Sequence, residues 1–151
     1  MLRVPHWRGL PTWGERAAIK GGALLAATAA LMACGTPAPA LPPEAERGRQ
    51  RYAQLGMGCH GDAATGRGWL PAAANHGPQG HTWHHGDGQL IDIVLGKLDY
   101  PDRKMPSFAG MLTEQEVRDV IDYLRANWTS EQRAAQGTVT RNELEQKAMD
   151  G

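Results

Sequence analysis

The sequence is poor in cysteine and in aromatic residues, and it lacks the common catalytic motifs. Of 151 residues, two are cysteines, one is phenylalanine and three are tyrosines. No G-x-S-x-G, H-E-x-x-H, paired Cys-x-x-Cys or phosphate-binding loop is present, so neither a serine hydrolase, a zinc hydrolase nor a nucleotide-dependent enzyme is indicated. Catalysis by the polypeptide itself therefore has no visible residues.

The sequence also has no net charge, and it is rich in glycine and proline, which interrupt helices and strands. Sixteen basic residues balance sixteen acidic ones, which gives no reason to expect nucleic acid as a partner. Nineteen glycines and ten prolines imply that much of the chain is loop. A short chain with a small apolar inventory and long loops fits a domain that needs a cofactor or metal at its centre.

The N-terminus has the pattern of an export signal. Basic residues precede an apolar run over 21–33, which is too short for the roughly 20 residues that span a bilayer. The run ends in "LMAC", which resembles the lipobox of bacterial lipoproteins. We predict a lipoprotein-type signal over 1–33, lipidation of Cys34, and a lipid-anchored protein on the periplasmic side of a bacterial membrane. An ordinary cleaved signal, giving a soluble periplasmic protein, and an uncleaved signal anchor are the alternatives.

The rest of the chain divides by composition. A proline-rich spacer covers 34–43, a domain covers 44–128, and a polar tail, predicted to be partly helical, covers 129–151. With Cys34 modified, Cys59 is the only thiol left in an oxidising compartment, which excludes a disulfide framework.

Three segments of the domain have helical periodicity, and no segment alternates convincingly as a strand. Apolar or small residues recur at helical spacing over 45–55, 87–98 and 114–128. The last of these is preceded by Thr113 in a capping-box pattern. Gly48 is costly inside a helix and indicates close approach of a second helix, so we expect 45–55 to cross 114–128.

Two short motifs carry the candidate chemistry. "GMGCH" at 56–60 differs at Gly56 from C-x-x-C-H, the heme-attachment pattern. "KMPSF" presents Met105 just before a proline, which keeps that residue out of the α region and on an extended segment. In their order, and with the helices around them, these motifs resemble the bacterial cytochrome c family.

The resemblance implies a fold, a cofactor and a role. The fold would be all-α: a small cytochrome c-like domain of three to four helices around one heme, with long loops. Cys59 would attach heme c through a single thioether, because Gly56 cannot form the second, and His60 and Met105 would be the axial iron ligands.

The protein would be an electron carrier rather than an enzyme, working with redox proteins of the membrane or periplasm and with no small-molecule substrate evident. It could also be a subunit of an oxidoreductase complex. Gly56→Cys would add a second thioether and stabilise the fold.

Alternatives remain open at this stage. Gly56 leaves room for non-covalent heme or no heme. A periplasmic copper-binding lipoprotein on a degenerate cytochrome fold is the competing hypothesis, since imidazole and thioether groups suit copper. The histidines concerned could equally form a solvated loop or hydrogen-bond near a heme edge; they are His76, His81, His84 and His85. Candidates for an apolar heme wall are Trp69, Leu70 and Trp83, which could equally shield any small core.

Overall fold

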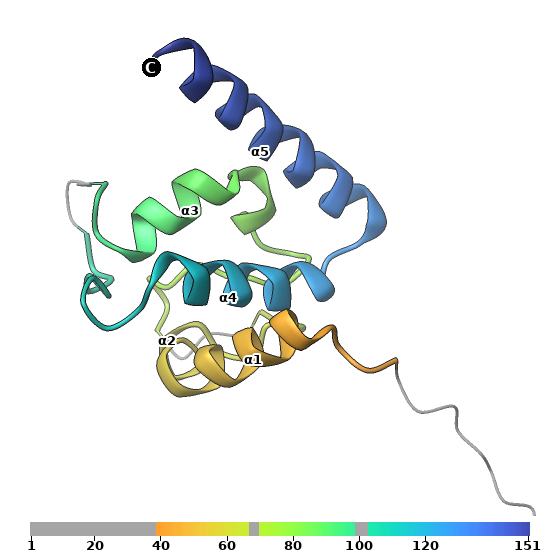
Figure 1. Ribbon diagram of the computed structural model, residues 1–151. Coiled ribbons are helices and arrows are strands. Elements are labelled where there is room, and N and C mark those ends of the chain that lie inside the picture. Colours follow the sequence, from red (N-terminus) through yellow and green to blue (C-terminus); the bar gives the residue numbers. More distant parts are fainter. Residues whose placement is uncertain (1–38, 67–69, 99–102) are drawn as a thin grey trace, which may run out of the picture. The chain divides into compact units, whose positions relative to one another are not determined.

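Helices account for the regular secondary structure in the described part of the chain. The computed structural model describes residues 39–66, 70–98 and 103–151, all within one compact unit, Ala38–Gly151. The predicted signal, Cys34 and Trp69 lie outside these ranges. The elements are α1 (Pro43–Leu55), α2 (Met57–His60), the 3-10 helix η1 (Thr82–His84), α3 (Asp87–Val94), α4 (Glu114–Ala126) and α5 (Ser130–Met149) (Figure 1). Within the described ranges the only extended pairing is an isolated bridge between Ala109 and Leu112. The all-α prediction is confirmed.

Helices α1 and α4 pack against each other, as Figure 1 shows. Gly48 makes this possible, because a Cβ added there would lie 1.8 Å from the backbone oxygen of Asp119. One turn further along α1, the rings of Tyr52 and Tyr123 are 5.6 Å apart. The predicted crossing of the two helices is therefore confirmed, with glycine at the point of closest approach.

Helix α4 is the central element because its apolar face enters both halves of the core. The predicted capping box is present: the Thr113 side chain accepts a hydrogen bond from the Glu116 backbone N–H at 3.2 Å, and Glu116 accepts one from the Thr113 N–H at 2.9 Å. One core cluster comprises Tyr52, Ala63, Tyr123, Leu124 and Trp128, and the other Leu90, Ile91, Leu95, Val117 and Ile121. Each large side chain buried in this way contributes about 1.5–3 kcal/mol.

Helix α3 is shorter than the periodicity predicts. The apolar pattern continues to residue 98, but the helix ends at Val94. The cause is Gly96, whose φ of 71° lies in the left-handed region, which terminates helices and favours glycine. The chain then turns back on the helix end, where the Gly96 N–H donates to Ile93 O at 3.2 Å and the Lys97 N–H donates to Asp92 O at 2.8 Å.

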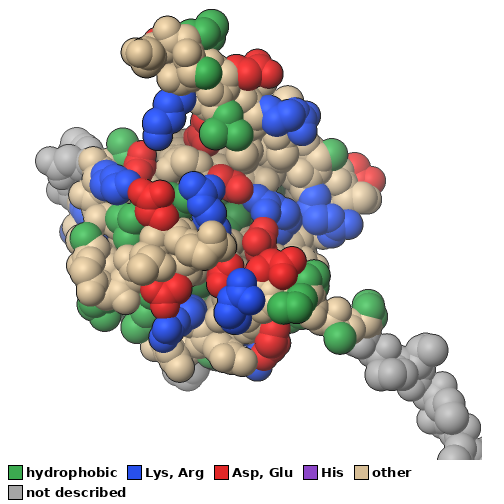
Figure 2. All heavy atoms as spheres, viewed as in Figure 1, with side chains coloured by type: hydrophobic (Ala, Val, Ile, Leu, Met, Phe, Trp, Pro, Cys, Tyr) green, Lys and Arg blue, Asp and Glu red, His purple; other side chains and the backbone are tan. Residues whose placement is uncertain are grey.

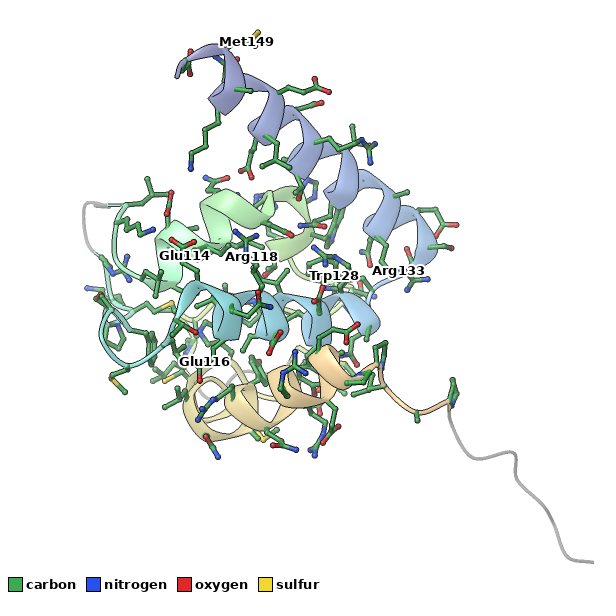
Figure 3. All side chains as sticks on the ribbon, viewed as in Figure 1. Glu114, Glu116, Arg118, Trp128, Arg133 and Met149 are labelled. Carbon is green, nitrogen blue, oxygen red and sulfur yellow. The ribbon has the colours of Figure 1, made fainter. Side chains whose placement is uncertain are left out.

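The polar tail forms α5, which begins with a second capping box between Thr129 and Gln132. Gln136 is the only residue of α5 that is buried. Its amide donates to the Asp87 carboxylate at 2.5 Å and accepts from Arg125 at 3.0 Å, which joins α5 to α3 and α4. Beyond these contacts the helix is largely exposed, and Figure 3 shows Met149 at its outer end.

The surface has mixed charge. Figure 2 shows acidic and basic side chains interspersed over the face formed by α1 and α4. Arg47 pairs with Asp119 at 2.7 Å and Arg51 with Glu116 at 2.6 Å. Among the described residues, no helix combines the length and apolar character needed to cross a membrane.

Candidate functional site

The "GMGCH" motif forms a short helical turn directly after α1. Gly56 separates the two helices and remains in the helical region, and its N–H bonds to the Tyr52 carbonyl at 2.8 Å. The N–H groups of Cys59 and His60 both bond to the Gly56 carbonyl, at 3.0 and 2.9 Å. This turn presents a half-buried free thiol and an imidazole on adjacent residues.

The orientation of His60 is fixed by a backbone carbonyl. Its Nδ1 lies 2.8 Å from the carbonyl oxygen of Ala74. A carbonyl oxygen can only accept, so Nδ1 carries a proton and donates, and in the neutral imidazole Nε2 is then the unprotonated nitrogen. A histidine held by its other ring nitrogen in this way is the usual arrangement of a metal ligand.

A second histidine lies against the first. The ring of His76 is 4.2 Å from that of His60, centroid to centroid, and its Nδ1 is 2.7 Å from the hydroxyl of Thr82. Burial, with a smaller contribution from the neighbouring His60, lowers the pKa of His76 to about 3. His76 is therefore neutral over the physiological range, and it packs beside His60 without adding charge.

Met105 lies on a loop that is tied to the end of α3. Its side chain is half-buried, and its carbonyl accepts a hydrogen bond from Arg103 Nε at 2.7 Å. Two residues further on, the Ser107 hydroxyl donates to the Leu95 carbonyl at 2.8 Å. Met105 and the Cys59–His60 pair thus come from separate segments, each held by its own hydrogen bonds.

The remaining histidines gather around η1. The rings of His81 and His84 stack at 4.4 Å, and His85 Nδ1 lies 3.0 Å from the Gln89 side-chain oxygen. Across the ranges that the structure describes, no three His, Cys, Asp or Glu side chains are grouped so that they could hold a metal ion. The structure therefore gives no support to a copper site built from His81, His84 and His85.

The candidate wall residues differ in their surroundings. Trp83 is half-buried and packs against the cluster that contains Tyr52 and Trp128, and its indole N–H donates to the Gly80 carbonyl at 3.0 Å. Leu70 is 52% exposed. Trp83 is thus part of the protein core, whereas Leu70 is an exposed apolar side chain close in sequence to the α2 turn.

Sequence reasoning missed two groups that organise the site. The Ala74 carbonyl that holds His60 has no sequence signature, because any residue supplies a carbonyl. Arg103 could have been noticed as a long donor-rich side chain two residues before Met105. Its importance depends on the helix end that it meets, and that end is shorter than the sequence predicts.

The donor set fits a c-type heme. A free thiol on Cys59, next to an imidazole with an unprotonated Nε2, provides both a group for a thioether and an iron ligand. Met105 provides a thioether on a segment held in place by Arg103 and Ser107. Position 56 departs from the usual pattern because glycine offers no sulfur.

The ring of Tyr52 occupies the space in front of Gly56. A Cβ at position 56 would lie 2.8 Å from Tyr52 Cδ2 and 2.9 Å from Cε2. That ring cannot move freely, because Tyr52 is 3% exposed and its hydroxyl donates to the Gly61 carbonyl at 2.8 Å. The prediction that Gly56→Cys stabilises the fold is therefore corrected. A side chain at position 56 has a packing cost against Tyr52, and a second thioether would first have to offset that cost.

Gly56→Ala isolates this packing cost from any new linkage. We expect it to lower the free energy of unfolding by about 1–3 kcal/mol, as overpacking of a filled core does, measured by denaturant unfolding followed by circular dichroism. Gly58→Ala in the same turn is the control, because a Cβ there meets nothing within 4 Å. Equal stability of the two variants would contradict the tight packing of Tyr52 over Gly56.

A family model described as cytochrome c oxidase, cbb3-type, subunit III matches residues 43–124, more than half of the chain. The matched segment begins with α1 and ends within α4, so it includes the α2 turn and the Met105 loop. Helix α5 lies beyond it. No match was found among curated proteins or among solved structures.

Proposed function

The chain belongs to the cbb3-type cytochrome c oxidase subunit III family, and from this premise we propose that Cys59, His60 and Met105 hold its heme. Membership of this cytochrome c family makes the protein an electron-transfer heme protein with a covalently bound c-type heme. When bound, the heme iron supplies a one-electron couple, and the polypeptide attaches it, ligates it and sets its surroundings. We assign these roles to Cys59, His60 and Met105.

The hydrogen bond from His60 Nδ1 to the Ala74 carbonyl is the observation that carries the proposal. It leaves Nε2 as the lone-pair nitrogen, and it fixes the ring plane on a turn that also holds Cys59. Donation to a carbonyl raises the basicity of the ligating nitrogen. His60 would thus bind the heme iron through Nε2, and Cys59 in the same turn would form the thioether bond to the heme.

Met105 is proposed as the second residue that would ligate the heme iron. A neutral thioether paired with an imidazole raises the reduction potential, which suits an electron carrier. Since Gly56 has no sulfur, attachment would rest on Cys59 alone, and the two axial ligands and packing would contribute a larger share of heme retention than in a doubly linked protein.

We further propose a cellular location and redox partners for the protein. "LMAC" before Cys34 supports a lipid anchor on the periplasmic side of a bacterial membrane. A cbb3 oxidase-type domain supports redox proteins of a membrane complex as electron donors and acceptors. A copper-binding lipoprotein is not favoured, because the family match points to heme and the histidines around η1 form no metal cluster among the described residues.

A redox titration of the exported, purified protein tests this function. We expect a low-spin heme spectrum that changes reversibly between an oxidised and a reduced form, with a sulfur-to-iron charge-transfer band in the oxidised form. Copper content is measured on the same sample. A colourless protein that binds copper stoichiometrically would overturn the proposal.

A further inference from the structure

Arg103 directs its guanidinium group at four backbone carbonyls. Its Nε donates to Met105 O at 2.7 Å, and Nη1 donates to Leu98 O at 3.2 Å. Its Nη2 donates to Ile93 O at 2.7 Å and to Pro106 O at 3.2 Å. All three nitrogens are therefore used, and one side chain connects the end of α3 to the backbone on both sides of the Met105–Pro106 peptide bond.

The end of α3 is a suitable anchor for a cation. The last carbonyls of a helix lack intrahelical partners and carry partial negative charge. Here Arg103 takes Ile93 O, while the Phe108 N–H donates to Val94 O at 3.0 Å and the Ser107 hydroxyl donates to Leu95 O. The loop thus donates to three consecutive carbonyls at the end of α3, of which Ile93 O also accepts the Gly96 N–H at 3.2 Å.

Only an arginine could make this set of contacts. Its planar guanidinium presents five N–H donors in a fixed fork, whereas lysine is a single point donor on a flexible stem. Arg103 holds Met105 from the N-terminal side, and Ser107 and Phe108 hold it from the C-terminal side. The backbone of Met105 is therefore fixed between two attachments to the same helix end.

We propose that Arg103 is a positioning residue that holds Met105 where its thioether would ligate the heme iron, and that it thereby disfavours the binding of other ligands to the iron. This inference rests on the proposed ligation by Met105. A thioether is a neutral and weak ligand, so its advantage over an external ligand depends on being held near the iron rather than on bond strength. Removing the hydrogen bonds of Arg103 should therefore loosen the Met105 loop and favour external ligands of the iron, although His60 and Met105 themselves are unchanged.

The test compares the heme-loaded wild type with Arg103→Gln and with Arg118→Gln, a control that removes an exposed arginine from α4 (Figure 3). Imidazole is the probe, titrated into the oxidised protein and followed through the sulfur-to-iron charge-transfer band. Arg103→Gln removes all four charge-assisted hydrogen bonds of the guanidinium group, and the loss of even one is worth about a factor of ten. We expect Arg103→Gln to weaken the band and to bind imidazole about tenfold more tightly, with Arg118→Gln unchanged.

The possible outcomes distinguish the positioning role of Arg103 from the proposed ligation of iron by Met105. A wild-type protein that binds heme but shows no charge-transfer band would refute Met105 ligation itself. A wild-type band that Arg103→Gln leaves unchanged, with unchanged imidazole affinity, would overturn the positioning role, even if thermal stability falls. Should the glutamine variant fail to fold, Arg103→Lys keeps the charge but not the fork, and the same loss of the band and gain in imidazole affinity are expected of it.

Discussion

Replacing Gly48 with alanine is expected to cost the domain a large part of its stability. The added Cβ would lie 1.8 Å from the Asp119 carbonyl oxygen and 2.7 Å from the Val120 nitrogen. These are backbone atoms of α4, so the clash is relieved only if the two helices separate and the Tyr52–Tyr123 contact opens. Overpacking against side chains costs about 1–3 kcal/mol, and we expect at least about 3 kcal/mol here, a large part of the 5–15 kcal/mol typical of a domain. Thermal and denaturant unfolding followed by circular dichroism measures it.

Gly137→Ala provides a matched control in another helix. Gly137 lies within α5, and a Cβ there would meet only Arg141 Nη1, at 3.7 Å. Alanine in an open helical position stabilises by about 0.5–1 kcal/mol, so the two substitutions should have opposite signs. If Gly48→Ala were as stable as Gly137→Ala, the close crossing of α1 and α4 would be wrong.

Replacing Cys59 with alanine is expected to abolish covalent heme attachment. Position 56 has no sulfur, and Cys59 is the only cysteine in the described residues. The heme-stained band of the denatured wild-type protein should therefore disappear, and acidified acetone should extract whatever heme remains. His60 and Met105 would still be present, so a reduced amount of non-covalent heme is compatible with this result.

Met57→Ala is the control for this experiment. Met57 is in the same turn and exposed, at 36%, so its removal should leave the stained band intact. A denatured Cys59→Ala protein that still carries stained heme would place the attachment elsewhere in the chain.

The sequence predicts the two crossing helices well because their signals are local. The apolar stripe and the Thr113–Glu116 capping box define α4 without reference to the rest of the fold. Gly48 points to a close contact because glycine in a helix is otherwise costly. The motif residues Cys59 and His60 also lie side by side in sequence, so their proximity needs no tertiary information.

Other features depend on contacts that periodicity does not encode. The apolar pattern of α3 continues beyond Gly96, but the positive φ of that glycine ends the helix. The partner of His60 is the backbone of Ala74, which any residue would supply. The docking of α5 rests on polar contacts of the buried Gln136 and of Thr140 and Glu143, which accept hydrogen bonds from N–H groups of the first turn of α3. These residues form no apolar stripe that periodicity could reveal.

The absorption spectrum of the reduced, pyridine-treated heme of the wild-type protein tests the central claim most directly. Attachment through Cys59 alone leaves one vinyl group unsaturated, and this extends the conjugation of the ring. We predict a covalently retained heme whose band lies slightly to the red of that of a doubly linked heme c. Absence of heme, or a band identical to that of a doubly linked heme, would contradict a single-thioether cytochrome.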